Sequence, residues 1–543
     1  MNLATSVRDR LTSLADGACI VALGADGTIA DTWSRERLLD EASTWTIRFT
    51  EAGLAPDDRI AVCPGRGPEL AALHLGALAA GLAIVPISTA STPDETSRLL
   101  AAAEPALIVT STAFAHASER ASAQARCRWW LSDVDPQPAN GLDRTTPAPP
   151  PSTKSSHALL PVARSRSDTA LILYTSGTTG RPKSVPLSHG NLLANLETLQ
   201  ALWARSAGDR LLHLLPAHHF HGLVLGLYGS LLVGNEIVLV PRFDARAALD
   251  AIRDFGVSLV MGVPTMYARM LEVAAVDDDV SGLRLAISGS APLPAVLATR
   301  FAERFGMSLV ERYGLTETGI VTSNPVDAPR PGSAGKPLPD TTVAIRVDDA
   351  HVCPEPGEES PRGEICVTGP AVCAGYGNDD GATAAAFRDG YFHTGDLGRF
   401  DADGYLWIDG RLKDLIIVGG SNVIPAEVER ALVDVDGVAE MVAAGVPDDD
   451  LGEVVAAYVV PSPRTVAGGA AADTEAGGEA GIGAGGAAGS APGRASNAAL
   501  EKALRSAAES KLAAYKRPRR YFFLAELPRN AMGKIDRASL PTG

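Results

Sequence analysis

Short β-rich runs alternate with longer runs rich in alanine and leucine, and this alternation constrains the fold more than any other feature. RIAVCP precedes ELAALHLGALAAG and then AIVPIS, and later VSLVMGVP precedes TMYARMLEVAA and then LRLAISGS. Strands separated by a helix-length segment pair in parallel, because the helix runs back along the sheet and the second strand then begins at the same end as the first. The sequence therefore predicts an α/β fold with parallel sheets and crossover helices.

The length of the chain requires more than one hydrophobic core. At 543 residues it exceeds the size at which a single core stops growing. A Pro/Ser-rich run at 147–156 is interpreted as a surface connection. A Gly/Ala-rich tract at about 467–496 has few large apolar side chains and is predicted to be an inserted flexible linker. Asn497 is predicted to cap the helix that follows it.

Charge and composition argue against several classes of protein. The formal net charge of −16 argues against a general nucleic-acid or anionic-membrane binder, because both need a basic face. The 6 cysteines form no CxxC pair, so their spacing indicates neither a zinc site nor a disulfide framework. The apolar stretch 221–234 is shorter than the roughly 20 residues of a membrane span and is interpreted as a buried core segment. With no signal-peptide pattern, a cytoplasmic location is expected, and the oligomeric state is left open.

The segment LILYTSGTTGRPKSVPLSHGN has the features of a phosphate-binding loop. An apolar strand over 171–174 leads into hydroxyl residues and glycines, which allow N–H and O–H groups to close on an anion. The P-loop pattern fails, because Pro182 stands where that pattern has glycine and offers no amide. Taken alone, the segment could also be a Thr/Gly-rich surface turn. The residues predicted to hold phosphate are Thr175, Ser176, Gly177, Thr178, Thr179, Gly180 and Lys183.

Four ordered segments resemble the adenylate-forming superfamily, which contains acyl-CoA synthetases, luciferases and the adenylation domains of peptide synthetases. They are TSGTTGRPK, ERYGLTETG, YFHTGDLGRF with DGYLWIDGRLKD, and PRNAMGKIDR. Ser184 departs from the pattern, in which glycine follows the lysine. The resemblance implies a carboxylate–CoA ligase that uses ATP, Mg²⁺ and coenzyme A and forms an acyl-adenylate, then a thioester. It also implies a large N-terminal adenylation domain of parallel-sheet α/β subdomains over 1–410 and a small mobile α+β domain over 411–543.

The resemblance assigns residues to the adenylation step. Lys534 is expected to swing in and bridge the carboxylate and the α-phosphate, although in isolation it would be interpreted as a surface lysine. Glu317 would hold Mg²⁺, and Thr316 beside it would touch the α-phosphate. Asp396 would accept the ribose hydroxyls, and Arg411 would reach the same ribose or the phosphate.

Thioester formation requires a second geometry, because the lysine must leave before the thiol enters. The resemblance makes Lys413 the hinge, and Gly419 and Gly420 would line the thiol channel, where the lack of a side chain matters. His219 in LPAHHFHG matches a residue near the acyl carboxyl group, with a structural role equally open. The nucleotide is further expected to contact Gly289, Ser290, Ala291, Arg312, Tyr313 and Gly314, with Tyr313 stacked on adenine.

The choice of acid is the least constrained feature. ISGSAPL, MGVPTMY and ERYGLTET resemble malonyl-CoA synthetases, in which an arginine holds the distal carboxylate; Arg284 is the matching position and Arg242 in PRFDAR the second. A guanidinium is the natural two-donor partner of a carboxylate. An arginine before this strand also occurs in relatives that use monocarboxylates. A fatty acyl-CoA synthetase, an adenylation enzyme that charges a carrier protein and a catalytically silent nucleotide-binding protein remain as alternatives.

Overall fold

The structure is a computed structural model that describes residues 2–63, 65–111, 128–131, 158–176, 182–276, 278–354, 357–462, 494–529 and 535–542. The chain divides into two compact units. Unit 1 comprises Met1–Pro361, Ile365–Thr394 and Arg399–Trp407, and unit 2 comprises Arg362–Glu364, Gly395–Gly398 and Ile408–Gly543.

The first sheet of unit 1 is parallel through its middle and antiparallel at both ends. Its order is β15 (Lys336–Pro337), β14 (Gly319–Ser323), β13 (Leu309–Leu315), β12 (Leu285–Ser288), β11 (Leu259–Gly262), β9 (Arg210–His213), β10 (Glu236–Leu239), β1 (Ala18–Leu23) and β2 (Ile29–Ser34). Neighbours from β13 to β1 pair in parallel, and β2, β14 and β15 pair antiparallel. The predicted parallel pairing of the VSLVMGVP and LRLAISGS strands, β11 and β12, is confirmed.

The second sheet of unit 1 is parallel except at one edge. Its order is β6 (Arg128–Leu131), β5 (Leu107–Thr110), β3 (Arg59–Cys63), β4 (Ala83–Pro86), β7 (Thr169–Ser176) and β8 (Pro182–Ser188), and β8 is the antiparallel strand. The RIAVCP and AIVPIS runs form β3 and β4, which pair in parallel across the helix α3, as predicted. The α/β architecture inferred from the alternation is confirmed.

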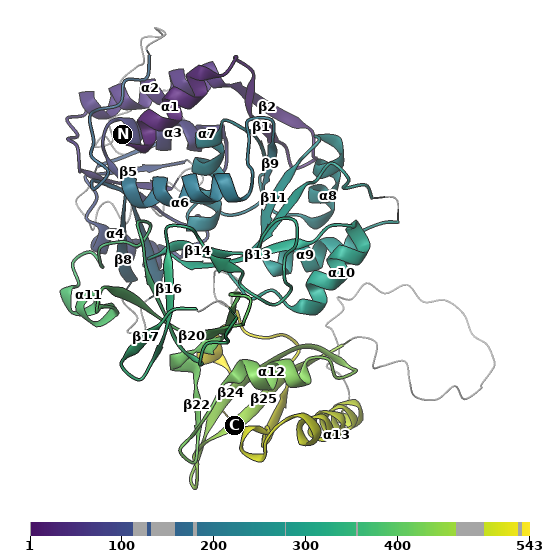
Figure 1. Ribbon diagram of the computed structural model, residues 1–543. Helices are drawn as coiled ribbons and strands as arrows, with labels where there is room; N and C mark the ends of the chain where they lie inside the picture. The colour runs from purple at the N-terminus through teal and green to yellow at the C-terminus, as the bar shows by residue number, and fades with distance from the viewer. Residues whose placement is uncertain are drawn as a thin grey trace. The chain divides into compact units, whose positions relative to one another are not determined.

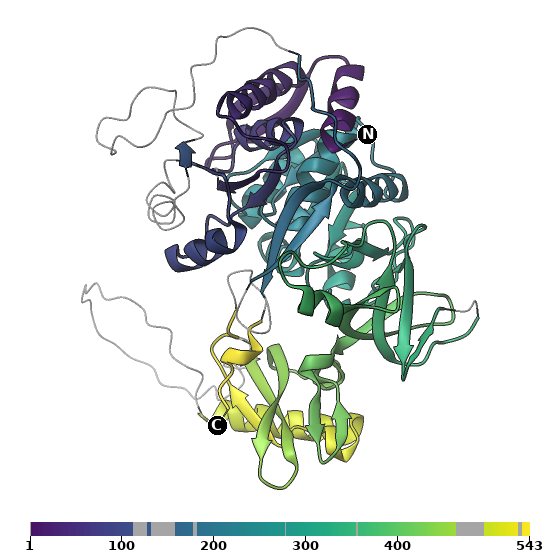
Figure 2. The same ribbon diagram turned by 90° about the vertical axis from the view of Figure 1, so that its left-hand side faces the viewer.

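Helices cover the sheets of unit 1, as Figures 1 and 2 show. Their bounds are α1 Leu3–Ser13, α2 Arg35–Glu51, α3 Pro68–Ala79, α4 Pro93–Ala103, α6 His189–Leu202, η2 His221–Tyr228, α7 Gly229–Val233, α8 Ala245–Asp254, α9 Pro264–Val273, α10 Ala295–Phe305 and α11 Asp380–Ala386. Successive residues of a strand face opposite sides. Leu259 and Met261 accordingly join the core beneath α1, α2, α3 and α6, whereas Val260 joins the core beneath α8, α9 and α10.

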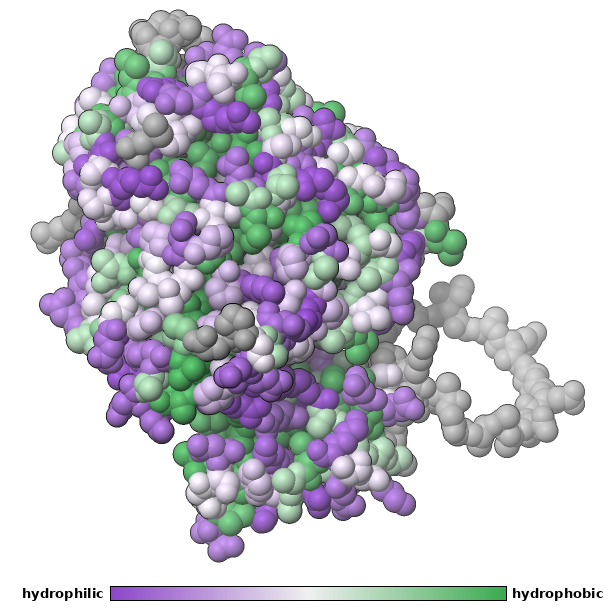
Figure 3. Space-filling model, in the orientation of Figure 1, coloured by the Kyte–Doolittle hydropathy of each residue, from purple (hydrophilic) through white to green (hydrophobic). Residues whose placement is uncertain are grey.

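The apolar stretch 221–234 forms η2 and α7, and nearly all of it is buried. The prediction of a buried core segment is therefore confirmed. Among the described residues, no helix combines the length and apolar character needed to cross a bilayer. On the face drawn in Figure 3, hydrophilic and hydrophobic residues are interspersed.

A third sheet follows in the order β17 (Ala350–Val352), β16 (Thr342–Val347), β18 (Gly363–Thr368), β20 (Tyr391–Phe400) and β19 (Phe387–Arg388), with β21 (Leu406–Arg411) paired to β20. The strands β18, β20 and β21 contain residues of both units.

Unit 2 contains a mostly antiparallel sheet covered on one face by two helices. Its order is β23 (Ser421–Val423), β22 (Ile416–Val418), β25 (Gly452–Pro461) and β24 (Val438–Asp448), with β26 (Arg520–Phe523) parallel to β25. The helices α12 (Pro425–Leu432) and α13 (Arg494–Lys511) share a core with it through Val428, Leu432, Leu500 and Leu504. Its short 3-10 turns are η3 Leu412–Asp414, η5 Ala514–Lys516 and η6 Arg537–Ser539.

The start of α13 corrects one prediction. The helix begins at Arg494, so Asn497 lies within its first turns and is not the residue that caps it. The last three residues assigned to the Gly/Ala tract, 494–496, therefore belong to the helix. The rest of that tract and the run 147–156 lie outside the described residues.

Candidate active site

The carboxyl ends of β12 and β13 bring two predicted nucleotide segments together. Gly289, Ser290 and Ala291 follow β12 directly, and β12 pairs in parallel with β13, which ends in the segment that carries Arg312 and Tyr313. Ligands of open α/β sheets bind outside the carboxyl ends of the strands. Ser290 has a φ of 68°, a left-handed conformation that is uncommon for serine and often occurs at functional sites.

A tight hairpin presents Thr316 and Glu317. Leu315 of β13 pairs with Gly319 of β14, so the residues between them form the tip. Gly319 closes the turn with a φ of 60°, which glycine adopts without steric cost. Gly314 is also required, because a Cβ there would lie 2.0 Å from the carbonyl oxygen of Gly319.

Tyr376 joins two residues that the sequence placed in different motifs. Its hydroxyl donates to Oε1 of Glu317 at 3.0 Å, and Nζ of Lys183 lies 4.6 Å from the centroid of its ring. Burial, and then the charge of Glu317, raise the pKa of Tyr376 above its ordinary value, so the hydroxyl remains a donor at neutral pH. Sequence reasoning missed Tyr376, because nothing in CAGYGND singles it out and the contact spans 59 residues.

The phosphate-loop prediction falls partly on described residues. Gly177, Thr178, Thr179 and Gly180 lie outside them, as does the side chain of Ser176. The strands β7 and β8 hold both ends of the loop, with Thr175 opposite Lys183. The backbone oxygen of Ser184 accepts from the amide of Gly377 at 2.9 Å. Ser184 thus fits into the strand next to the segment that carries Tyr376.

The chemistry around Glu317 fits a hard divalent cation. Glu317 is 8% exposed as a residue, and carboxylate oxygens are the ligands that Mg²⁺ takes in proteins. The neighbouring Lys183 would carry the complementary charge for a phosphate group. These two residues would hold a metal–nucleotide complex from two directions.

Two residues predicted to contact ribose lie together in unit 2. Nε of Arg411 is 2.8 Å from Oδ1 of the buried Asp396. Arg411 is 45% exposed, so it is accessible to a ligand while it holds the carboxylate in place. Lys413 follows in η3 and is exposed. Lys534 lies outside the described residues.

Gly419 and Gly420 form the two-residue turn between β22 and β23. Their φ values are 55° and 82°, and hairpin turns with two left-handed residues strongly favour glycine. The geometry of the turn therefore gives a reason for both glycines that is independent of the predicted thiol channel.

The structure argues against the predicted role of Arg284. Its Nε and Nη2 bind Asp209 at 2.7 and 2.6 Å, and Nη1 and Nη2 also donate to the carbonyls of Trp203 and Ala204. Arg284 precedes β12, whereas Gly289 follows it, so roughly 13 Å of strand separates them. The Arg284 side chain belongs to an internal ion pair at the opposite end of the strand, and this contact disfavours its predicted role as the partner of a substrate carboxylate.

Arg242, the second candidate for binding the distal carboxylate, lies beyond the carboxyl ends of the strands. Arg242 follows β10 after two residues and is exposed. His219 follows the neighbouring strand β9, is half-buried and packs against His218 with ring centroids 4.1 Å apart. Both therefore lie beyond the carboxyl ends of their strands, where ligands bind.

Arg312 combines burial with open hydrogen-bonding capacity. It is 6% exposed, and its Nε and Nη2 have no hydrogen-bond partner among the described residues. The guanidinium lies directly against Gly289, where a Cβ would be 2.4 Å from its Cζ. Burial lowers the pKa of Arg312 to about 10, so the side chain remains charged at neutral pH. A buried charge of this kind is expected to have an anionic partner.

His221 and Ser290 complete this polar cluster. Nδ1 of His221 lies 3.3 Å from Oγ of Ser290, and its buried Nε2 has no partner among the described residues. Burial first, and then the charge of Arg312, hold the pKa of His221 well below its usual range. The imidazole is therefore neutral at neutral pH.

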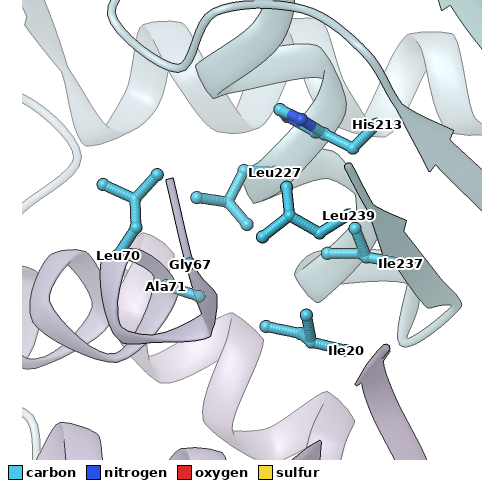
Figure 4. A pocket seen from close by; sticks show the side chains of 8 residues that line it. All are labelled: Ile20, Gly67, Leu70, Ala71, His213, Leu227, Ile237 and Leu239. Carbon is cyan, nitrogen blue, oxygen red and sulfur yellow. The ribbon is translucent and has the colours of Figure 1, made fainter. Parts of the chain in front are cut away.

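An enclosed cavity elsewhere in unit 1 is too small for a substrate. Figure 4 shows it between β1, β9, β10, η2 and the start of α3, lined mostly by aliphatic side chains, with His213 at one side. Its volume of about 10 Å³ is roughly the minimum for one water molecule.

Comparison with known families accounts for this arrangement. The AMP-binding enzyme profile matches residues 20–377, and that of the AMP-binding enzyme C-terminal domain matches residues 427–534. The chain belongs to the AMP-binding enzyme family. The predicted superfamily and the α/β fold class are thereby confirmed.

Several proteins similar to this AMP-binding enzyme are named as CoA ligases, which join an acid to a thiol. A long-chain-fatty-acid–CoA ligase of Bacillus subtilis is 38% identical over 379 residues, which are 69% of this chain and 61% of that one. A sulfoacetate–CoA ligase of Cupriavidus necator is 33% identical over 513 residues, 93% of this chain and 91% of that one. The solved structure of ATP-bound MatB from Rhodopseudomonas palustris is 31% identical with a TM-score of 0.81, covering 99% and 98% of the two chains. This enzyme thus spans less than two thirds of the Bacillus relative.

Proposed function

We propose that the protein is an ATP-dependent carboxylate–CoA ligase that forms an acyl-adenylate and then an acyl-CoA thioester. The arrangement of Lys183, Tyr376 and Glu317 carries this proposal. Lys183 lies over the ring of Tyr376, and the Glu317 carboxylate accepts from the hydroxyl of the same residue. A positive charge and a carboxylate that can bind a metal ion would reduce the repulsion between the two anionic substrates, ATP and a carboxylate. Mg²⁺ held by Glu317 would neutralise phosphate charge, and Thr316 at the hairpin tip would contact the α-phosphate.

The remaining assignments belong to the same proposal. Asp396 and Arg411 would bind the ribose, Lys534 would complete the adenylation geometry, and Lys413 would be the hinge between an adenylation domain over 1–410 and a mobile domain over 411–543. We place the enzyme in the cytoplasm. The described cysteines are free thiols.

We infer that the acid carries a second anionic group, as malonate does, and that Arg312 receives it. In Arg284, Nε and Nη2 each donate to one oxygen of the Asp209 carboxylate. In Arg312 the same two atoms are buried and have no hydrogen-bond partner among the residues that the structure describes. The named substrate of the Cupriavidus relative, sulfoacetate, also bears an anionic group one carbon from its carboxylate. Arg242 remains a second candidate at the same edge of the sheet, and His219 remains a candidate neighbour of the reacting carboxyl group.

The proposal is tested by pyrophosphate release with malonate, methylmalonate, sulfoacetate, butyrate and a long-chain fatty acid, with and without CoA. We expect malonate or methylmalonate to have the highest kcat/KM, and acyl-CoA to appear only when CoA is present. Pyrophosphate release without thioester formation would favour an enzyme that charges a carrier protein. A preference for butyrate or a fatty acid would remove the dicarboxylate assignment and leave the ligase assignment standing.

A further inference from the structure

Three metal-ligating side chains from separate strands converge in the third sheet, in unit 1. They are His351 of β17, Cys366 of β18 and His393 of β20, and one ligand atom from each lies within 4.8 Å of the others. Sγ of Cys366 is 3.4 Å from Nδ1 of His393, and both residues are buried. None of the three belongs to the residues assigned to ATP, CoA or the acid.

The three residues lie close together although the order of the strands would separate two of them. β17 and β20 are three strand spacings apart, which is about 14 Å in a flat sheet. The ring centroids of His351 and His393 are nevertheless 5.6 Å apart, and His351 stacks on Tyr391 at 4.3 Å. The hairpin of β16 and β17 must therefore curl over the face of the sheet, which positions His351 above β20.

The distances suit one tetrahedral ion. With bonds of about 2.3 Å to sulfur and 2.0 to 2.1 Å to nitrogen, two ligands of tetrahedral zinc lie about 3.6 Å apart when one is sulfur and the other nitrogen. The observed 3.4 Å between Cys366 and His393 is close to this value. All three ligand atoms lie within 4.8 Å of one another, so the half-buried His351 would move by at most about 1 Å to reach tetrahedral spacing. Its buried Nε2 has no hydrogen-bond partner among the described residues.

We propose that His351, Cys366 and His393 form a binding site for one Zn²⁺ ion, with water as the fourth ligand. A thiolate with two imidazoles is a donor set that zinc favours, whereas Mg²⁺ and Ca²⁺ favour oxygen. Binding converts the Cys366 thiol to a thiolate and releases its proton to solvent, so affinity falls as pH falls. The ion would link β17, β18 and β20 and thereby stabilise the curled hairpin.

The test is metal titration of the full chain after removal of bound metal with a chelator. Zn²⁺ alone should bind with one equivalent per chain at submicromolar Kd and raise the Tm, and Co²⁺ should give a thiolate-to-cobalt charge-transfer band. His351→Gln and Cys366→Ser should weaken Zn²⁺ binding by about a hundredfold or more, and Cys366→Ser should also remove the cobalt band. Cys19→Ser, a buried cysteine outside the cluster, should keep both.

Two controls separate the site from other zinc ligands and from misfolding. The metal-free Tm of each variant shows whether it folds, and the half-buried His351 gives a variant that disturbs the core least. Zinc binding by wild type should release about one proton between pH 6 and 8, measured in buffers of different ionisation enthalpy. Unchanged Zn²⁺ affinity in His351→Gln and Cys366→Ser, or absence of the cobalt band in wild type, would overturn the site and leave the ligase proposal untouched.

Discussion

Replacement of Arg312 by methionine separates substrate recognition from stability, because the two effects have opposite signs. The guanidinium is buried, and its Nε and Nη2 have no hydrogen-bond partner within the described part of the chain. Replacing a whole buried ion pair with apolar side chains of similar volume is often neutral or stabilising by about 1 to 4 kcal/mol, and a buried charge without a partner is less favourable than a paired one. Removal of a charge that receives a substrate anion costs about 2 to 5 kcal/mol of transition-state stabilisation. We therefore expect Arg312→Met to fold at least as stably as wild type and to lose about thirtyfold or more in kcat/KM for malonate.

The matched control is Arg284→Met, which breaks the ion pair with the buried Asp209. Because the Arg284 side chain is 36% exposed, we expect a loss of about 1 to 3 kcal/mol in unfolding free energy with no change in substrate preference. The assay is the ratio of malonate to butyrate kcat/KM, measured with urea unfolding of each variant. The reasoning fails if Arg312→Met keeps the wild-type ratio, or if Arg284→Met is the variant that shifts it.

Outcomes are also expected for four other variants. Tyr376→Phe keeps the ring but loses the hydrogen bond to Glu317, so pyrophosphate release should slow about tenfold with little change in Tm; an unchanged rate would exclude Tyr376 from the site. Burial raises the pKa of Glu311 from 4.5 to about 8, so its contribution to stability is complete below pH 4.5 and is lost as pH rises towards 8. Glu311→Gln should flatten the fall in unfolding free energy over that range, and urea melts at several pH values test this. Lys534→Ala should abolish adenylate formation but spare thioester formation from supplied acyl-adenylate, and Lys413→Pro should do the reverse, in assays of the separate half-reactions.

Much of the fold could be predicted because it depends on local periodicity. The β3–α3–β4 and β11–α9–β12 units follow from short apolar runs separated by helix-length segments, and a parallel pairing is the arrangement that such a spacing allows. The start of α13 was missed, because Arg494 precedes Asn497 without any capping pattern.

The site was less predictable because proximity in sequence does not establish which end of a strand a residue occupies. Arg284 and Gly289 flank the same four-residue strand, yet one pairs with Asp209 and the other follows the carboxyl end. Arg312 was assigned to the nucleotide, and only its burial beside Gly289 suggests a role with the acid.

The sequence by itself determined the family, the parallel sheets and the residues of the four motifs, because short-range patterns and turn chemistry encode them. Only the tertiary structure decided that Tyr376 lies between Lys183 and Glu317, or that Cys366 faces His393. Those pairs come from strands and loops distant in the chain, and sheet order and hairpin curvature set their distances. No local sequence pattern encodes these distances, because they depend on how all the elements of the core pack together.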